Sequence, residues 1–342
     1  MIRAQNASLK HLNSFSVDAR AERLLTLQNP EDLDTLFSEH LYNPHTDLIL
    51  GGGSNVLFAN DVPGSVILNR VAGKRIVEDS DTDVLVEANA GENWHRLVLW
   101  SLDQGLSGIE NLSLIPGLAG AAPMQNIGAY GVELADLLES VQVRDLSTGE
   151  SRHFKHDECQ FGYRDSRFKT VDVGRFLITA IRLRLSRVFE PKLDYAGIGQ
   201  ELDEMGISRP VAKQVSQAVI RLRQRKLPDP EVLGNAGSFF KNPVIERATA
   251  KALEEQFFGL PVYPLNERYS KISAAWLIDH CGWKGHREGD AGVSPDHALV
   301  LVNYGNASGQ DLLTLAAKIM TSVYEVFGIQ LVPEPNIIGP GS

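Results

Sequence analysis

The stretch at 115–131, IPGLAGAAPMQNIGAYG, constrains the fold more than any other part of the chain. It holds four glycines, four alanines and no charged side chain. Such a run is too apolar for a solvated loop and too rich in glycine and proline for a stable helix or strand. Its backbone polar groups therefore need partners other than a regular ladder. A large buried ligand supplies such partners, and a packed loop between elements is the alternative.

A second glycine stretch, LILGGGSNVLF at 48–58, lies between two predicted strands. It does not match the dinucleotide fingerprint GxGxxG, because Val56 stands at the third glycine and VLF continues as strand. Two interpretations remain for this stretch. Its consecutive glycine N–H groups can form a nest for a phosphate, with Ser54 and Asn55 as added polar groups, or the stretch is a plain tight hairpin. The absence of GxxxxGK[ST] sets a P-loop aside. Two such stretches in one chain favour a dinucleotide.

The remaining segments predict alternating helices and strands. Asn29 caps a helix that starts at Pro30, and Gly105 stops another. The residue before Pro228 is pushed out of helical geometry, so a domain boundary falls nearby. We expect domains at 1–70, 71–215 and 216–342. Further helices are predicted at 93–104, 210–226, 246–257, 272–281 and 308–327, and strands at 83–90, 141–146, 175–185 and 297–303. In the last helix Asp311 follows three residues after the cap at Ser308, and Gly328 ends the helix.

Charge and cysteine content exclude several classes of function. The 342 residues carry 43 acidic and 33 basic side chains, a net charge of −10, which argues against nucleic acid as a partner and favours a small molecule. Cys159 and Cys281 form no CxxC pair, so no disulfide framework or thiolate zinc site is expected. No signal peptide or apolar run of about 18 residues is visible, and we expect a cytoplasmic protein without a membrane partner.

Six motifs follow one another along nearly the whole chain. They are LGGGSNVLF, IPGLAGAAPMQNIGAYG with the following GVEL, FGYRDSRF at 161–168, KLPDP at 226–230, GNAGSFFKNP at 234–243 and PEP at 333–335. Their order resembles the UDP-N-acetylenolpyruvoylglucosamine reductase family, flavoenzymes of peptidoglycan precursor synthesis. The resemblance implies an α+β fold: a bipartite FAD-binding domain of the vanillyl-alcohol-oxidase (PCMH) type, then a C-terminal α+β substrate-binding domain. The segment LDYAGIGQ resembles the longer subtype, in which a loop bearing a tyrosine closes over the substrate.

The reaction that the resemblance implies is reduction of UDP-N-acetylglucosamine enolpyruvate to UDP-N-acetylmuramate. Non-covalent FAD delivers a hydride to one vinyl carbon, NADPH reduces the flavin and leaves before the substrate binds, and the protein supplies a proton to the other carbon. The charge that develops beside the carboxylate needs cations or hydrogen-bond donors. By resemblance, Ser238 is the proton donor, Arg164 binds and polarises the carboxylate, and Glu334 assists in stabilising the enolic intermediate.

Each catalytic residue has a structural alternative. A serine in a glycine-rich loop commonly caps or turns the backbone, although Gly237, two phenylalanines and Pro243 suit a fixed hydroxyl at Ser238. Arg164 next to Asp165 is also compatible with a surface ion pair, while its planar fork suits a carboxylate. Glu334 between two prolines is either a rigid exposed turn or a stiffly mounted carboxylate.

The resemblance also implies ligand-binding residues. Lys226 and Asn242 match the diphosphate-binding pair, Tyr195 the tyrosine of the mobile loop, and His297 a polar substrate contact whose residue type varies. The basic end of the 210–226 helix otherwise complements the helix dipole. HCGWKGH at 280–286 has no recognised metal-ligand spacing, so no metal is expected. The expected FAD-binding residues are Gly51, Gly52, Gly53, Ser54, Asn55, Ile115, Pro116, Gly117, Ala121, Gln125, Asn126, Gly128 and Tyr130.

Two other functions compete with the reductase hypothesis. An FAD-dependent oxidase of a small alcohol or lactone keeps the flavin fold, but its members often attach flavin through a histidine or cysteine, and neither glycine stretch contains one. A nucleotide-sugar binding module without turnover predicts loss of Ser238, Arg164 or Glu334, and all three are present. The sequence does not separate NADPH from NADH, and a monomer is the working expectation. The implied roles include cell-wall biogenesis, cell shape, cell cycle and cell division.

Overall fold

A computed structural model of the chain describes residues 1–195 and 197–339, and these divide into two compact units. The first unit contains Met1–Ala7, Ala21–Gly53 and Val62–Arg225. The second contains Ser8–Arg20, Ser54–Asp61 and Lys226–Ser342. The chain therefore enters the second unit twice before its last third. The domain boundaries expected at 70 and 215 stay predictions.

The first unit has a four-stranded sheet near the N-terminus. As the sequence predicts, Asn29 caps α1 and Pro30 is the first helical residue. The structure adds a capping box between Asn29 and Asp32. Leu33 and Leu36 of α1 pack in a core with strand residues of this sheet. The order is β1-β2-β5-β3, with β1 Ile2–Ser8, β2 Arg20–Leu27, β5 Val62–Asn69, β3 Leu48–Leu50 and α1 Pro30–Ser38.

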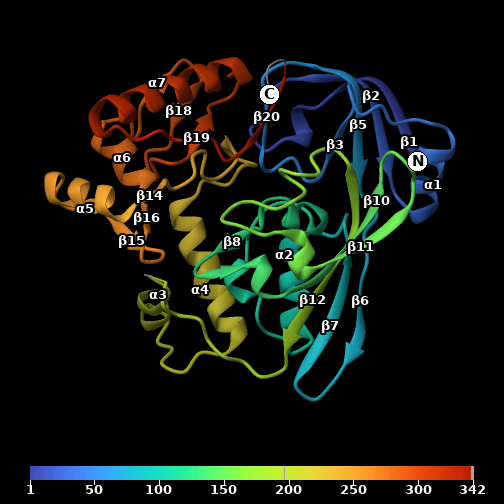
Figure 1. The fold of residues 1–342 in the computed structure, drawn as a ribbon, viewed down its shortest axis with the longest axis horizontal. Helices are drawn as coiled ribbons and strands as arrows, with labels where there is room; N and C mark the ends of the chain where they lie inside the picture. Colours follow the sequence, from blue (N-terminus) through green and yellow to red (C-terminus); the bar gives the residue numbers. More distant parts are fainter. Residues whose placement is uncertain (196, 340–342) are drawn as a thin grey trace. The chain divides into compact units, whose positions relative to one another are not determined.

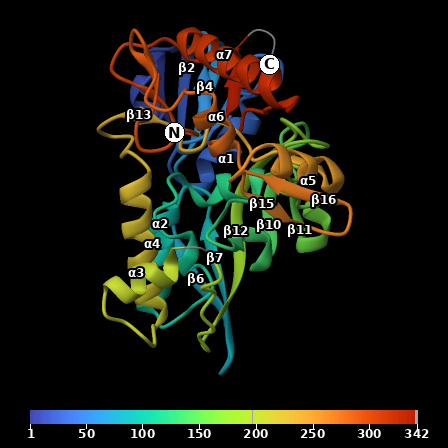
Figure 2. The same ribbon diagram turned by 90° about the vertical axis from the view of Figure 1, so that its left-hand side faces the viewer.

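A five-stranded antiparallel sheet forms the larger part of the first unit. Its central strands β7 and β12 lie side by side in both ribbon views (Figures 1 and 2). Trp94, Leu97 and Val98 of α2 pack in the same core as this sheet, and the Trp94 Nε1 donates to the carbonyl of Leu112 at 3.0 Å. The order is β11-β10-β12-β7-β6, with β6 Lys74–Asp79, β7 Asp83–Asn89, α2 Trp94–Asp103, β10 Leu138–Asp145, β11 Ser151–Lys155 and β12 Phe176–Ser186. The strands predicted at 83–90, 141–146 and 175–185 and the helix at 93–104 are confirmed.

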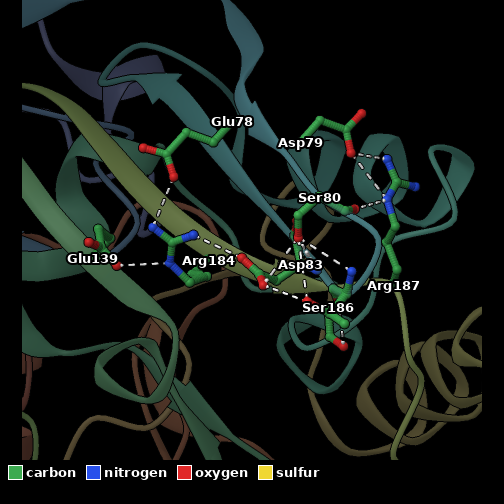
Figure 3. Close-up of polar contacts among 9 residues, drawn as sticks. Glu78, Asp79, Ser80, Asp83, Glu139, Arg184, Ser186 and Arg187 are labelled. Carbon is green, nitrogen blue, oxygen red and sulfur yellow. Dashed lines mark hydrogen bonds and ion pairs between the residues drawn. The ribbon is translucent and has the colours of Figure 1, made fainter.

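One arginine links the exposed ends of four strands in this sheet. Arg184 of β12 donates to Glu78 of β6 at 3.2 Å, to Asp83 of β7 at 2.8 Å and to Glu139 of β10 at 3.1 Å (Figure 3). Hydrogen bonds from Arg184 are the main cause that lowers the pKa of Asp83. Because all of these groups are partly solvated, the cluster pins the register of the strands more than it stabilises the fold.

Two helices are the last elements of the first unit along the chain. α3 (Ile198–Glu204) and α4 (Ala212–Lys226) share a small core of aliphatic residues, and the two helices lie together in Figure 2. The buried carboxylate of Glu201 on α3 forms ion pairs with Arg225 and Arg221 on α4. A hydroxyl pair, Ser113 and Ser216 at 2.8 Å, joins α4 to the segment that precedes residues 115–131, here called the apolar loop.

The loop at 115–131 is more regular than the sequence predicts. It contains a 3-10 helix, Ala119–Gln125, and a short strand, β8 (Gly128–Ala129), which pairs with β9 (Val132–Glu133). Amides at the start of the loop bond outside it: Ala119 donates to Glu92 at 2.8 Å and Gly120 to Ala90 at 3.0 Å. Short i→i+3 turns accommodate Pro123 where a long α-helix would not. The other 3-10 turns within residues 1–195 and 197–339 are Lys10–Leu12, Glu110–Leu112, Leu134–Asp136 and His156–Cys159.

The second unit is built on two small antiparallel sheets. α7 packs on β18 and β19 of the first sheet and also contacts α6 (Figure 1). Ser308 and Asp311 form the predicted capping box of α7, and Gly328 ends the helix in a left-handed conformation. The first sheet is β13-β19-β18-β17, with β13 Gly234–Asn235, β17 Arg287–Glu288, β18 Ala291–Val293, β19 Leu301–Asn303, α6 Ala274–His280 and α7 Gly309–Phe327. The second is β14-β16-β15, with β14 Val244–Glu246, β15 Val262–Pro264, β16 Tyr269–Ile272 and α5 Arg247–Gln256.

The structure corrects one expected strand and excludes one alternative for the glycine turn. The strand predicted at 297–303 begins only at Leu301, because His297 starts a turn in which its carbonyl accepts from Val300 at 3.0 Å. The strands around Gly51–Gly53 are not a tight hairpin. In the first unit β3 pairs in parallel with β5, and in the second β4 (Val56–Phe58) pairs in parallel with β20 (Asn336–Ile338). Among the described residues, no helix is both long and apolar enough to cross a membrane.

Candidate active site

The two glycine stretches meet inside the first unit. A Cβ atom added to Gly52 would lie 2.7 Å from the Cα of Gly117, and one added to Gly51 would lie 3.2 Å from the Cβ of Ala121. No side chain fits at Gly52 without moving the opposite backbone. Glycine is therefore required at Gly52, and this close approach brings the turn at 51–53 against the apolar loop.

The turn leaves backbone donors without acceptors. Within residues 1–195 and 197–339, the N–H groups of Gly52 and Gly53 donate no hydrogen bond, although Gly53 is buried. Gly53 has a φ of +67°, and the carbonyl of Gly51 accepts from Arg70 at 3.1 Å. Successive amides in such a turn form a concave anion site. These residues fit the diphosphate of FAD, and the neighbouring small side chains fit its ring system.

The other predicted FAD residues of the first unit lie in or beside the apolar loop. Asn126 is buried, and its side chain donates to Glu133 at 2.8 Å and accepts from Ala135 at 2.9 Å, so it holds the end of the loop. Its contact with the cofactor stays a prediction. The others, Ile115, Pro116, Ala121, Gln125 and Gly128, follow the loop and are half-buried except for the exposed Pro116.

Arg164 reaches the end of the apolar loop. Its Nη2 donates to the carbonyl of Gly128 at 2.6 Å, and a Cβ added to Gly128 would lie 2.9 Å from its Nη1. The backbone of Arg164 is left-handed, with a φ of +54°. A non-glycine residue in that conformation is strained, and such strain collects at functional sites. The structure thus holds the Arg164 guanidinium in a fixed place beside the loop.

A second guanidinium, that of Arg223 in the last turn of α4, lies close to Arg164, and sequence reasoning missed it. Its Nε is buried without a hydrogen-bond partner, and no carboxylate among the described residues pairs with it. Burial, and then the charge of Arg164, lower the pKa of Arg223, while the Tyr130 phenol opposes this. The positive charge of Arg223 also contributes, after burial, to the lowered pKa of His95. A desolvated cation without an anion marks a place for a negatively charged ligand.

Helical spacing was the one signal that could have separated Arg223 from its neighbours. Arg221 and Arg225 point toward α3, where both pair with Glu201, whereas Arg223 lies two positions away from each on the helix and faces elsewhere. The expected dipole role therefore suits Arg221 and Arg225 and not Arg223.

Tyr195 and Tyr130 form an edge-to-face pair in the first unit. Their ring centroids lie 5.0 Å apart with an interplanar angle of 72°. Tyr195 remains 48% exposed, whereas burial raises the pKa of the Tyr130 phenol. The predicted substrate residue Tyr195 thus sits against a predicted cofactor residue.

In the second unit the structure brings Ser238 and Glu334 together. Gly237, with a φ of +70°, turns the chain into Ser238, and its amide donates to the Asn235 side chain at 2.9 Å. Phe239 is fully buried, and its amide donates to the carbonyl of Leu299 at 2.7 Å. The amide of Glu334 donates to the carbonyl of Phe239 at 2.8 Å, which places the two predicted catalytic residues on adjacent antiparallel segments.

Phe239 and Phe240 explain why that arrangement is rigid. Their rings contact edge to face with centroids 5.1 Å apart, and Phe239 also packs on Phe15 at 6.2 Å. The residue after them continues the ladder, because the Lys241 amide donates to Val332 at 2.9 Å. Both phenylalanines are core anchors, and the half-buried Ser238 between them and Gly237 is fixed by its neighbours.

A basic cluster lies near His297 in the same unit. Burial, and then the charges of Lys226 and Lys284, lower the pKa of His297, so its ring favours the neutral form. Lys284 is the second residue that sequence reasoning missed, since nothing in HCGWKGH distinguishes it from a solvated lysine. Asn242 accepts from the amide of Ala274 at 2.9 Å, and within the described part of the chain its Nδ2 donates no hydrogen bond. Two ammonium groups and a free amide suit a diphosphate.

Ser54 and Asn55, the last predicted FAD residues, belong to the second unit. The Asn55 Nδ2 donates to the carbonyl of Glu334 at 3.4 Å, and the Asn55 carbonyl accepts from Asn336 at 3.0 Å. The residues after the glycine turn therefore support the PEP segment. Among residues 1–195 and 197–339, no group of three histidine, cysteine or acidic side chains is arranged to hold a metal ion.

Comparisons with known proteins identify the family. Residues 229–338 match the model of the UDP-N-acetylenolpyruvoylglucosamine reductase C-terminal domain, and residues 21–155 match an FAD binding domain. A UDP-N-acetylenolpyruvoylglucosamine reductase of Xanthomonas axonopodis pv. citri is 50% identical over 337 residues, which is 98% of this chain and 96% of that one. The chain belongs to the UDP-N-acetylenolpyruvoylglucosamine reductase family. The enzyme of that name from Chromobacterium violaceum is 49% identical over 334 residues, 97% of this chain and 98% of that one.

A solved structure agrees with the family assignment. The crystal structure of the UDP-N-acetylenolpyruvylglucosamine reductase from Thermus caldophilus aligns with a TM-score of 0.65 and 27% identity, and covers 99% of this chain and 98% of that one. The expected fold, an FAD-binding domain followed by a C-terminal α+β domain, is confirmed. The resemblance inferred from the six motifs is confirmed as well, whereas the individual site residues stay predictions.

Proposed function

We propose that the chain is an FAD-dependent, NADPH-oxidising reductase that converts UDP-N-acetylglucosamine enolpyruvate into UDP-N-acetylmuramate in peptidoglycan precursor synthesis. The turn at 51–53 and the apolar loop at 115–131 hold the FAD. Bound FAD supplies the hydride that it has received from NADPH. Membership of the reductase family favours this reaction over the oxidase alternative.

The chain's own residues handle the substrate charge and the proton. Arg164 binds the substrate carboxylate through its planar fork, and Arg223 adds a second positive charge beside it. Ser238 donates the proton to the vinyl carbon, and Glu334 stabilises the enolic intermediate that precedes this transfer. In the basic cluster, Lys226 and Lys284 bind the diphosphate with Asn242, and the neutral His297 contacts the polar part of the nucleotide sugar. Tyr195 covers the substrate.

The 2.8 Å hydrogen bond between the Glu334 amide and the Phe239 carbonyl carries the proposal. It holds a serine and a carboxylate on adjacent backbones that a glycine turn and two buried phenylalanines fix. A serine is a weak acid in water, so a catalytic role requires an environment that positions its hydroxyl and excludes solvent. The segment 237–241 fixes the backbone that carries this hydroxyl and buries Ser238 in part.

An anaerobic visible spectrum of the purified protein tests the function. Flavin bands should bleach with NADPH and return when UDP-N-acetylglucosamine enolpyruvate is added to the reduced protein. Bands that return only with air would support the oxidase alternative, and absence of bands after FAD is supplied would exclude a flavoenzyme.

Several wider features belong to the same proposal. We expect a cytoplasmic monomer whose partners are small molecules, with no nucleic acid or membrane involved. Through its product it would support cell shape, the cell cycle and cell division.

A further inference from the structure

One buried amide joins two segments of the first unit that matter for substrate binding. Asn111 is fully buried, and its Nδ2 donates to the carbonyl of Tyr130 at 2.8 Å and to the carbonyl of Lys192 at 2.9 Å. Tyr130 ends the apolar loop, and Lys192 lies three residues before Tyr195. No motif drew attention to Asn111 in the sequence.

The orientation of this amide shows that donation is its role. Both partners are carbonyl oxygens, so the amide nitrogen must face them. The Oδ1 is buried without a hydrogen-bond partner among the described residues. A buried, unsatisfied acceptor is costly, so the two donated bonds have to offset that cost.

At one end Asn111 supports a strained turn. Tyr130 has a φ of +52°, and the next residue, Gly131, has a φ of +82°. A left-handed tyrosine persists only where its surroundings fix it. The bond from Asn111 fixes the Tyr130 carbonyl, and this sets where the Tyr130 ring meets Tyr195.

At the other end Asn111 anchors the base of the Tyr195 segment. Phe189 and Leu193 pack on the core shared by α3 and α4, and the Lys192 ammonium lies 3.6 Å from Asp136. The segment is therefore held at 189–193, while Tyr195 itself is half exposed. Asn111 supplies the backbone hydrogen bond within this anchor.

We propose that Asn111 is a positioning residue: it holds the Tyr195 segment against the end of the apolar loop and so determines the position from which Tyr195 covers the substrate. This rests on the proposed function. Asn111 does not itself touch the substrate: it acts through the Tyr130 and Lys192 carbonyls. Loss of the two hydrogen bonds makes the backbone that precedes Tyr195 more mobile.

A double-mutant cycle tests whether Asn111 acts through Tyr195. Asn111→Ala and Tyr195→Ala should each lower kcat/KM for UDP-N-acetylglucosamine enolpyruvate by about 10-fold, mainly through KM, since two net hydrogen bonds are lost in the first variant. The kcat/KM of the double variant should be no lower than that of the less active single variant. Asn111→Leu, which keeps the volume, should match Asn111→Ala and covers the case in which the alanine variant does not fold. Multiplication of the two effects in the double variant would overturn the proposal.

Ser216→Ala is the matched control. It removes a buried side-chain hydrogen bond on α4 but has no bond to the Tyr195 segment. Its effect on kcat/KM should be small and should multiply with that of Tyr195→Ala. If Ser216→Ala reproduces the effect of Asn111→Ala, then Asn111 is merely structural and the proposal fails.

Trypsin gives a second readout that is independent of turnover. The carbonyl that Asn111 holds is that of Lys192, the scissile carbonyl for trypsin. Cleavage after Lys192, followed by mass spectrometry of the FAD-loaded protein, should be several-fold faster in Asn111→Leu than in Ser216→Ala or the parent. An unchanged rate would overturn the proposal. If the parent protein does not reduce the enolpyruvyl substrate, the proposed function fails while this measurement still decides whether Asn111 anchors the segment.

Discussion

The backbone amide of Glu334 donates a 2.8 Å hydrogen bond to the carbonyl of Phe239, the residue that follows Ser238. This bond links two segments that are 95 positions apart in the sequence. It makes the Ser238 position depend on the C-terminal PEP segment, because the Lys241 amide also bonds to Val332. Ser238 and Glu334 therefore lie on two segments that the same ladder of backbone hydrogen bonds holds together.

Replacement of Ser238 should separate the two halves of the reaction. Ser238→Ala should leave reduction of the flavin by NADPH nearly unchanged and slow its reoxidation by the enolpyruvyl substrate by about 10² to 10⁴, the usual contribution of a general acid. Stopped-flow absorbance of each half-reaction measures this. The matched control is Ser308→Ala, which removes the α7 cap, costs about 1 kcal/mol of unfolding free energy and should leave both rates intact. Equal slowing of both halves in Ser238→Ala would refute the proton-donor role.

The contact between the two glycine stretches predicts a specific loss of cofactor. A methyl group at Gly52 would lie 2.7 Å from the Gly117 backbone, so Gly52→Ala should force the loop apart and lower FAD affinity by at least about 10-fold. FAD retained after gel filtration measures the loss. Gly199→Ala makes the same chemical change in α3, where nothing lies within 4 Å, and should keep FAD and gain up to about 1 kcal/mol of stability. Full FAD occupancy in Gly52→Ala would contradict the assigned site.

Local patterns were enough to predict the separate elements but not how they are joined. The caps at Asn29 and Ser308, and the strand segments at 83–90 and 175–185, were predicted from short-range signals, and all were confirmed. The sequence left a tight hairpin open as one interpretation of the glycine turn, because the two flanking strands are adjacent in sequence. Each strand instead finds a distant partner, β5 for β3 and β20 for β4, and a local pattern holds no information about such pairing.

The candidate site shows the same limit. Resemblance of the motifs to the reductase family pointed to Ser238, Arg164 and Glu334, whereas the residues alone left a structural alternative for each. Arg223 lies in an ordinary helical sequence and Asn111 in a short 3-10 turn. Within the described part of the chain, Arg223 is set apart only by its buried, unpartnered Nε, and Asn111 only by the two carbonyls within hydrogen-bond distance of its amide. Those properties arise from residues far away in the chain.

Arg223 should lower the stability of the ligand-free protein and contribute to binding of the substrate. Arg223→Met removes a desolvated cation without an anion, so the protein without ligands should gain about 1 kcal/mol of unfolding free energy. Its kcat/KM for the enolpyruvyl substrate should fall by about 10², with partial recovery in Arg223→Lys. Urea unfolding and steady-state kinetics measure the two effects.

Arg225→Met provides the contrast on the same helix. It leaves the buried Glu201 carboxylate without its main partner, so stability should fall by about 1–3 kcal/mol while kcat/KM stays near that of the parent. A stability loss in Arg223→Met comparable to that of Arg225→Met would mean that Arg223 has a structural partner and no ligand role.

His95 should make the first unit sensitive to acid. Its Nδ1 accepts from the amide of Leu114 at 3.0 Å, next to the start of the apolar loop, and this requires a ring without a proton on that nitrogen. Burial, and then the charge of Arg223, lower the pKa of His95 below its ordinary 6.5. The unfolded chain therefore binds a proton that the folded chain excludes. Stability should be full above about pH 6.5 and should decline as the pH falls from there toward the folded-state pKa, by at most about 1.4 kcal/mol per pH unit.

His95→Asn should remove this slope while keeping an acceptor for the Leu114 amide. Urea unfolding at steps from about pH 8 to about pH 5, with flavin fluorescence as a second signal for opening of the loop, compares the two proteins. His297→Gln is the companion variant in the second unit, where burial and two lysines also lower the histidine pKa, and the two variants should flatten the curve additively. If His95→Asn keeps the slope of the parent, protonation of His95 does not limit stability, and its bond to Leu114 survives in acid.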